Sequence, residues 1–161
     1  MNPTVYRLHQ KPKTPGEPGL PKTPVKSANI ELSGLSGDHN NFRYNKKKNH
    51  PDMAIMILSM DVLNDLNDEG WPVRPGDLGE NITLENFSYD SIEPKQQYHI
   101  GSIIVEITII CDPCSTLQVL PYVQKKRLKE FMSTLIKRRG WYAKVLKTGK
   151  IHRGDLVKKL N

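Results

Sequence analysis

The amino-acid sequence predicts a mainly β fold, a β-rich barrel decorated by helices. Roughly eight short segments have the length and composition of strands, and Gly- and Pro-rich turn signals separate them. Two segments have the spacing of apolar residues that an amphipathic helix requires. Alternating βαβ units would place a helix between successive strands, whereas this chain offers hairpins. A length of 161 residues favours a single domain.

The first forty residues predict two strands joined by irregular chain. Residues 4–9 alternate as a short strand does, and residues 25–32 return to a strand-like pattern. Between them, residues 11–24 contain five prolines and two glycines, which exclude regular structure. Residues 33–40 predict a turn, because their two glycines can adopt a positive φ.

The next segment predicts a polar loop, a strand and a helix. Residues 40–51 are polar, and the Lys46–Lys48 run within them indicates a solvated loop. Residues 53–58 are an apolar run of strand length. Ser59 is a candidate N-cap for a helix that ends at Gly70. The buried stripe of this helix is predicted to consist of Val62, Leu63 and Leu66.

The second half predicts five more strands around one helix, and one of them is a short strand that follows a loop within residues 89–100. Residues 76–84 pass from glycines into a strand. Residues 102–110 form the clearest strand, with four apolar side chains on one face: Ile103, Val105, Ile107 and Ile109. A helix is predicted from Pro121, at its first position, to Gly140, with an apolar face of Leu128, Phe131, Met132, Leu135 and Ile136. Residues 141–146 and 151–159 predict two closing strands.

Both cysteines, Cys111 and Cys114, follow the 102–110 strand directly, where Pro113 ends the strand ladder. One interpretation is a pair of small buried apolar residues, and a second is a redox dithiol. A third is a metal-binding thiolate, because thiolates are ligands for soft metals. A closed zinc or iron–sulfur site is disfavoured, since such sites commonly need four ligands and the chain has two cysteines and five scattered histidines. The cysteine pair alone does not decide among the three.

The charge of the chain is concentrated near its C-terminus. The formal net charge is +7, and residues 121–161 carry 13 Lys/Arg against 2 Asp/Glu. Such a positive field attracts nucleic acid, anionic lipid or a small molecule that carries phosphate, although a solubilising surface has the same composition. The residues that follow the second helix, 137–139 with Trp141 and Tyr142, are predicted to combine cations and a planar surface in one anion site.

The apolar segments are all shorter than a membrane span, and the proline-rich N-terminal segment lacks a signal-peptide pattern. We therefore expect no membrane association and a cytoplasmic location. Two cysteines three residues apart do not make a disulfide scaffold, which agrees with a reducing compartment.

Taken together, the motifs of this chain resemble the MOSC family, the molybdenum cofactor sulfurase C-terminal domain family, in its short stand-alone form. The order and spacing of the matching segments carry the resemblance over nearly the whole chain, 1–161. These segments are Pro21-Lys22-Thr23-Pro24-Val25, Gly34-Leu35-Ser36-Gly37-Asp38-His39, Pro75-Gly76-Asp77-Leu78-Gly79-Glu80-Asn81-Ile82-Thr83, Ile100-Gly101, Pro113-Cys114 and Arg138-Arg139-Gly140-Trp141-Tyr142.

The resemblance implies a closed β-barrel with peripheral helices that binds the molybdenum cofactor, which is molybdopterin with molybdenum. It implies that Cys114, the cysteine after the proline, is the protein ligand to the metal. The cofactor contributes a phosphate and an anionic dithiolene, which basic side chains would bind. The predicted cofactor-binding residues are Lys22, Asp38, Asn81, Thr83, Arg138 and Arg139.

The leading hypothesis for activity is an oxidoreductase that reduces N-hydroxylated or related small substrates, with Cys114 and His39 as its catalytic residues. His39 is the candidate general acid, because the ordinary pKa of histidine lies near neutrality. The chain lacks a dinucleotide fingerprint and has too few cysteines for a cluster, so a separate electron-donor reductase is the expected partner. A homodimer is one expected assembly.

Other hypotheses remain open from the residues. The family resemblance also fits a carrier that delivers the cofactor without turnover of its own. A nucleic-acid-binding role for the basic C-terminal quarter ranks third, and a thioredoxin-type dithiol ranks fourth. Cys111 departs from the family pattern, in which a basic residue is common at this position, and is predicted to be a packing residue.

Overall fold

The computed structural model of the chain describes residues 1–40, 43–44 and 48–161. Its strands are β1 (Thr4–Gln10), β2 (Thr23–Val25), β3 (Ser27–Glu31), β4 (Gly34–Leu35), β5 (Ile55–Ser59), β6 (Ile82–Glu85), β7 (Gln97–Ile100), β8 (Ile103–Ile110), β9 (Trp141–Lys147), β10 (Gly149–His152) and β11 (Val157–Lys159). The helices α2 (Met60–Asp68) and α3 (Gln124–Thr134) accompany them, with short 3-10 helices η1 (Pro51–Met53), η2 (Tyr89–Ser91) and η3 (Ser115–Val119).

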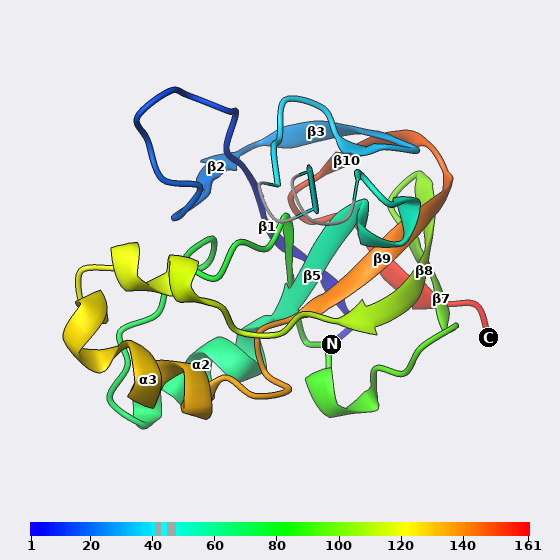
Figure 1. Cartoon of the computed structure of the whole chain (residues 1–161). Helices are drawn as coiled ribbons and strands as arrows, with labels where there is room; N and C mark the ends of the chain where they lie inside the picture. Colours follow the sequence, from blue (N-terminus) through cyan, green and yellow to red (C-terminus); the bar gives the residue numbers. More distant parts are fainter. Residues whose placement is uncertain (41–42, 45–47) are drawn as a thin grey trace.

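The strands form two sheets. The larger is a mixed, eight-stranded sheet in the order β11-β7-β8-β9-β5-β6-β1-β2, and the smaller has the order β10-β3-β4. Neighbours pair antiparallel except β5 and β6, which run parallel because the intervening chain, with α2, crosses from one to the other. Helices α2 and α3 gather at one end of the molecule, and β3 and β10 lie at the opposite end (Figure 1).

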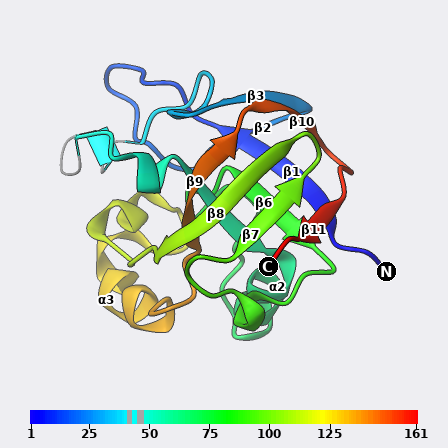
Figure 2. The same cartoon turned by 90° about the vertical axis from the view of Figure 1, so that its right-hand side faces the viewer.

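The prediction of a closed β-barrel is wrong, because both sheets are open in the part of the chain that the structure describes. The edge strands of the large sheet are β11 and β2, and no ladder joins them. Strand β1 already pairs with β6 and β2, and it meets the chain around the start of β11 only through an isolated bridge between Thr4 and Leu156 and a few backbone hydrogen bonds beside it. The three residues of β11 are too few to extend that bridge into a ladder. The sheet curls, as Figure 2 shows, without closing.

Most predicted elements are confirmed, with shifted ends. Strand β1 matches the 4–9 prediction, β3 falls within 25–32, and β9 matches 141–146. In α2 the predicted stripe Val62, Leu63 and Leu66 is buried. Of the Lys46–Lys48 run, Lys46 and Lys47 lie outside the described residues, and Lys48 is exposed.

Two predicted patterns are wrong near the site. The helix predicted from Pro121 to Gly140 spans only α3, and Ile136, placed on its apolar face, is 61% exposed. In β8, Ile109 is exposed rather than buried, because the register with β9 shifts between Ile107 and Ile110. Such an irregularity ends the two-residue alternation and turns the following side chains to new directions.

One large hydrophobic cluster unites the strands with the inner faces of α2 and α3, and Phe131 of α3 is its largest fully buried side chain. Trp71 packs on that ring at a centroid distance of 4.6 Å. Among the described residues, no helix combines the length and the apolar character that a membrane crossing requires.

Candidate functional site

A cavity of about 380 Å³ lies where the end of β8 and the start of β9 meet the loops that follow β1, β4 and α2. Its wall includes both cysteines, two cations, a histidine and several apolar side chains. The lining residues are Gly19, Leu20, Lys22, His39, Asn40, Met53, Met56, Leu78, Gly79, Ile109, Ile110, Cys111, Asp112, Pro113, Cys114, Thr116, Arg139 and Tyr142. Its size is within the range of small-molecule sites.

Cys114 follows Pro113, four residues past the end of β8, and is the N-cap residue of η3. Its Sγ lies 2.8 Å from Oγ1 of Thr116 and accepts a hydrogen bond from Nη1 of Arg139 at 3.0 Å. Burial raises the pKa of the Cys114 thiol, but the Arg139 guanidinium and the Thr116 hydroxyl together lower it more, so the pKa lies below its ordinary value. The site therefore favours a thiolate.

Arg139 is buried, and backbone carbonyls fix its guanidinium. Its Nε donates to the Leu78 carbonyl at 3.2 Å, and its Nη1 donates to the Asp112 carbonyl at 3.1 Å. A planar guanidinium bound at two edges has little freedom to turn away from Cys114. The cation is thus held at the cavity wall before any ligand binds.

Cys111 lies in a different environment from Cys114, although only two residues separate them. It is 3% exposed, and its Sγ donates to the Tyr142 hydroxyl at 3.4 Å. Burial is the largest influence on the pKa of the Cys111 thiol and raises it above its ordinary value. Cys111 is therefore less readily ionised than Cys114.

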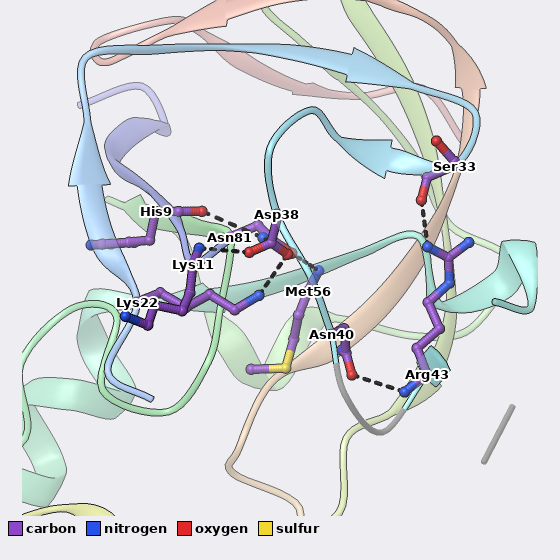
Figure 3. Close-up of polar contacts among 9 residues, drawn as sticks. All are labelled: His9, Lys11, Lys22, Ser33, Asp38, Asn40, Arg43, Met56 and Asn81. Carbon is purple, nitrogen blue, oxygen red and sulfur yellow. Dashed lines mark hydrogen bonds and ion pairs between the residues drawn. The ribbon is translucent and has the colours of Figure 1, made fainter. Parts of the chain in front are cut away.

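Lys22 brings a second cation to the cavity through a buried network (Figure 3). Its Nζ lies 2.8 Å from Oδ2 of Asp38, and the same oxygen accepts from Nδ2 of Asn81 at 2.9 Å. Asn81 in turn accepts from the Met56 amide at 3.0 Å. Asp38 and Asn81 thus lie behind the lining residues, and their contacts fix Lys22 and the β5 backbone.

His39 lines the cavity, and its Nε2 is buried without a hydrogen-bond partner among the described residues. Its ring lies 5.2 Å from that of Tyr44. His39 and Gly19 also line a second cavity of about 220 Å³, which the proline-rich loop after β1 encloses. His39 thus brings a buried nitrogen that has no partner among the described residues to the junction of the two cavities.

Two predicted site residues lie elsewhere. Thr83 is buried in β6 and donates to Oε1 of Glu80 at 2.9 Å. Arg138 points away from the lining residues and pairs with Glu69 at 2.7 Å. The anion site predicted at the end of the second helix is thus divided, since Arg139 and Tyr142 reach the cavity and Arg138 does not.

Several contributors were not predicted from the sequence. Thr116 could have been found, because a hydroxyl two residues after Cys114 lies within local reach of the thiol. The Leu78 carbonyl and the Met56 side chain had no such signal, since tertiary packing brings them to the cavity. Arg43 is buried by contacts with backbone carbonyls, among them that of His50 at 2.9 Å, and secures the loop near His39.

In the described part of the chain, no group of three or more His, Cys, Asp or Glu side chains is arranged to hold a metal ion. A metal in this cavity would therefore need most of its ligands from a bound cofactor. The donor set fits such a group, because it combines a thiol of lowered pKa with two buried cations at one cavity.

One family model and several solved structures match this chain. The family model of the MOSC domain matches residues 44–158. The chain resembles the crystal structure of YiiM from Geobacillus stearothermophilus with a TM-score of 0.73 and 23% identity, over 99% of this chain and 75% of that one. The crystal structure of the YuaD protein from Bacillus subtilis matches with a TM-score of 0.76 and 17% identity, over 98% of this chain and 94% of that one.

YiiM from Escherichia coli gives a TM-score of 0.70 and 17% identity, over 100% of this chain and 70% of that one. These structures share the fold of this chain. No curated protein matches the sequence.

Proposed function

Because this chain belongs to the MOSC domain family, which is associated with molybdenum cofactor binding, we propose that it binds the molybdenum cofactor in the large cavity. The contact between Cys114 Sγ and Nη1 of the buried Arg139, at 3.0 Å, carries this proposal. It supports a stable thiolate in the cavity wall, and a thiolate is the protein ligand that a soft metal centre accepts.

The residues that would hold the cofactor follow from the same wall. Cys114 would ligate the metal, and Arg139 and Lys22 would face the anionic dithiolene and the phosphate. When bound, the cofactor supplies a metal centre for two-electron chemistry. Asp38 and Asn81 keep Lys22 in place and are positioning residues, because neither lines the cavity.

We propose that the activity is the reduction of N-hydroxylated or related small substrates. His39 would donate a proton to the leaving oxygen, since the residue lines the cavity and its Nε2 has no hydrogen-bond partner among the described residues. Electrons would come from a separate reductase.

We also propose that residues 1–161 form one cytoplasmic domain, which the single large core cluster and the free thiols support.

The binding proposal is tested by elemental analysis and pterin fluorescence on protein from a host that makes the cofactor. We expect about one molybdenum and one pterin per chain. Protein that contains neither under these conditions would remove the proposal.

The catalytic proposal is tested separately from binding. Cofactor-loaded protein is incubated with N-hydroxylated substrates and a chemical reductant, and product is measured by chromatography. Turnover supports the oxidoreductase, and its absence in loaded protein supports a cofactor carrier, which would use the same cavity without reacting. A His39→Gln variant that loses turnover but retains molybdenum would support the proton-donor role.

A further inference from the structure

The turn at residues 74–80 contacts both residues that bring a cation to the cavity, although the turn supplies no charged side chain to the wall. The Gly76 carbonyl accepts from the Lys22 amide at 3.0 Å, and the Leu78 carbonyl accepts from Nε of Arg139 at 3.2 Å. Leu78 and Gly79 themselves line the cavity. The position of this turn therefore sets where the Lys22 backbone and the Arg139 guanidinium lie.

A buried carboxyl group, that of Glu80, holds this turn on the side away from the cavity. Glu80 is fully buried, and its Oε1 accepts from the Gly76 amide at 2.7 Å and from Oγ1 of Thr83 at 2.9 Å. Its Oε2 has no hydrogen-bond partner among the described residues. Burying a carboxyl group with one oxygen unpartnered costs free energy. The presence of Glu80 at this position therefore calls for a structural or functional reason.

The geometry around Gly76 leaves the turn little room to adjust. Gly76 has a φ of +93°, and a Cβ at this position would lie 2.7 Å from the Lys22 carbonyl oxygen and 2.8 Å from Cδ2 of His9. His9 is fully buried with both ring nitrogens unpartnered among the described residues. The turn is thus packed between His9 on one side and Glu80 on another. The hydrogen bond to Glu80 fixes the Gly76 amide.

We propose that Glu80 is a further positioning residue of the cavity, and that it places the Lys22 backbone and the Arg139 guanidinium by fixing the turn at residues 74–80. Glu80 touches neither the cavity nor Cys114, so it acts through two carbonyls and not through contact with a ligand. The use of the two cations toward an anionic cofactor rests on the proposed function, but their placement by Glu80 does not. Burial raises the pKa of Glu80 to about 7, and the hydrogen bonds from Gly76 and Thr83 oppose that rise.

The test is native-state hydrogen exchange of the isotopically labelled full chain, measured by NMR at one pH. The reporters are the Lys22 amide and Nε–H of Arg139, and their exchange is expressed relative to the slowest amides of β5. This ratio cancels a general loss of stability. Glu80→Leu removes the acceptor, and Glu80→Gln keeps an acceptor oxygen of similar placement.

We expect both reporters to exchange about tenfold faster or more in Glu80→Leu, because the Gly76 amide loses its buried partner. In Glu80→Gln they should stay within about threefold of the wild-type values, since one acceptor bond of this kind is retained. Ile103→Val, a buried change in β8 away from the cavity, is the control and should leave both ratios unchanged. Thr83→Val, which spares the Gly76 contact, should have a smaller effect than Glu80→Leu.

Unchanged ratios in Glu80→Leu would overturn the proposal. If that variant does not fold, Glu80→Asp is used, because it shortens the side chain while it keeps the carboxyl; unchanged ratios there would have the same consequence. Molybdenum content is measured on the same samples. Its absence from wild-type protein would count against the proposed function alone, whereas the exchange ratios judge Glu80 in either case.

Discussion

Two buried cations line the cavity, and the folded chain balances their charges differently. Lys22 lies 2.8 Å from Asp38, so a carboxylate neutralises it within the protein. Arg139 contacts two carbonyls and the Cys114 thiol, and no carboxylate of the described residues pairs with it. Its charge is balanced only when Cys114 ionises or an anion enters the cavity.

The two cations therefore differ in their partners: Lys22 is paired with a carboxylate of the protein, and Arg139 is paired with the thiol of Cys114. Lys22 keeps a carboxylate partner behind the cavity wall, so its charge is partly balanced before a ligand binds. The Arg139–Cys114 pair leaves a thiolate and a cation available to a ligand, which is the arrangement that cofactor binding requires. The comparison predicts that changes at Asp38 act mainly on stability, and that changes at Arg139 also act on the thiol.

The largest effect on stability is expected for Asp38→Asn. This change leaves a buried ammonium without its counter-ion, and breaking such a pair typically costs about 3–5 kcal/mol. Chemical denaturation measures the loss. The double variant Lys22→Met with Asp38→Asn should recover much of it, because no unpaired charge remains; a double variant as unstable as Asp38→Asn alone would contradict this account of the pair.

A smaller loss is expected for Arg139→Gln, about 1–3 kcal/mol, because the buried Leu78 carbonyl and the part-buried Asp112 carbonyl lose their donor. The same change should shift the alkylation of Cys114 by iodoacetamide to higher pH. In the wild type, burial raises the pKa of the thiol but Arg139 and Thr116 lower it more, so removal of Arg139 lets burial dominate.

Peptide mass spectrometry identifies the alkylated cysteine in this experiment. Cys111 should remain unmodified throughout, since it is buried and the pKa of its thiol is raised. An alkylation curve that is the same in wild type and Arg139→Gln would show that the guanidinium does not stabilise the thiolate.

The smallest effect is expected for Arg138→Gln. Arg138 pairs with an exposed carboxylate, Glu69, and contributes nothing to the cavity wall. We expect the melting temperature and the alkylation of Cys114 to be unchanged within error. A change in the Cys114 reaction as large as that of Arg139→Gln would mean that the two neighbouring arginines act together.

The contrast between these arginines also marks what the sequence could predict. Strand and helix patterns placed β1, β8 and β9 well, because periodicity reports which face is buried. Two consecutive arginines look alike in a sequence, and only the turn after α3 sends one inward to Leu78 and the other outward to Glu69. Ile109 is a similar case, since the irregular register at the end of β8 has no local signal.

The prediction of a closed barrel was wrong for a related reason. Strand count and turn spacing predict a β-rich architecture, but closure depends on whether the two edge strands can pair over several residues. Here β11 is short and β1 is already paired on both edges. The role of Glu80 was equally hidden, because its contacts with Gly76 and the distant effect on Arg139 arise only in the folded chain.

The account depends most on the inequality of the two cysteines. The most direct test is the molybdenum content of Cys114→Ser and Cys111→Ser, purified beside the wild type from a host that makes the cofactor. We predict that Cys114→Ser retains almost no molybdenum, because a hydroxyl is a harder and less readily ionised donor, and that Cys111→Ser retains it. Equal loss of metal in both variants, or full retention in Cys114→Ser, would contradict the assignment of Cys114 as the protein ligand.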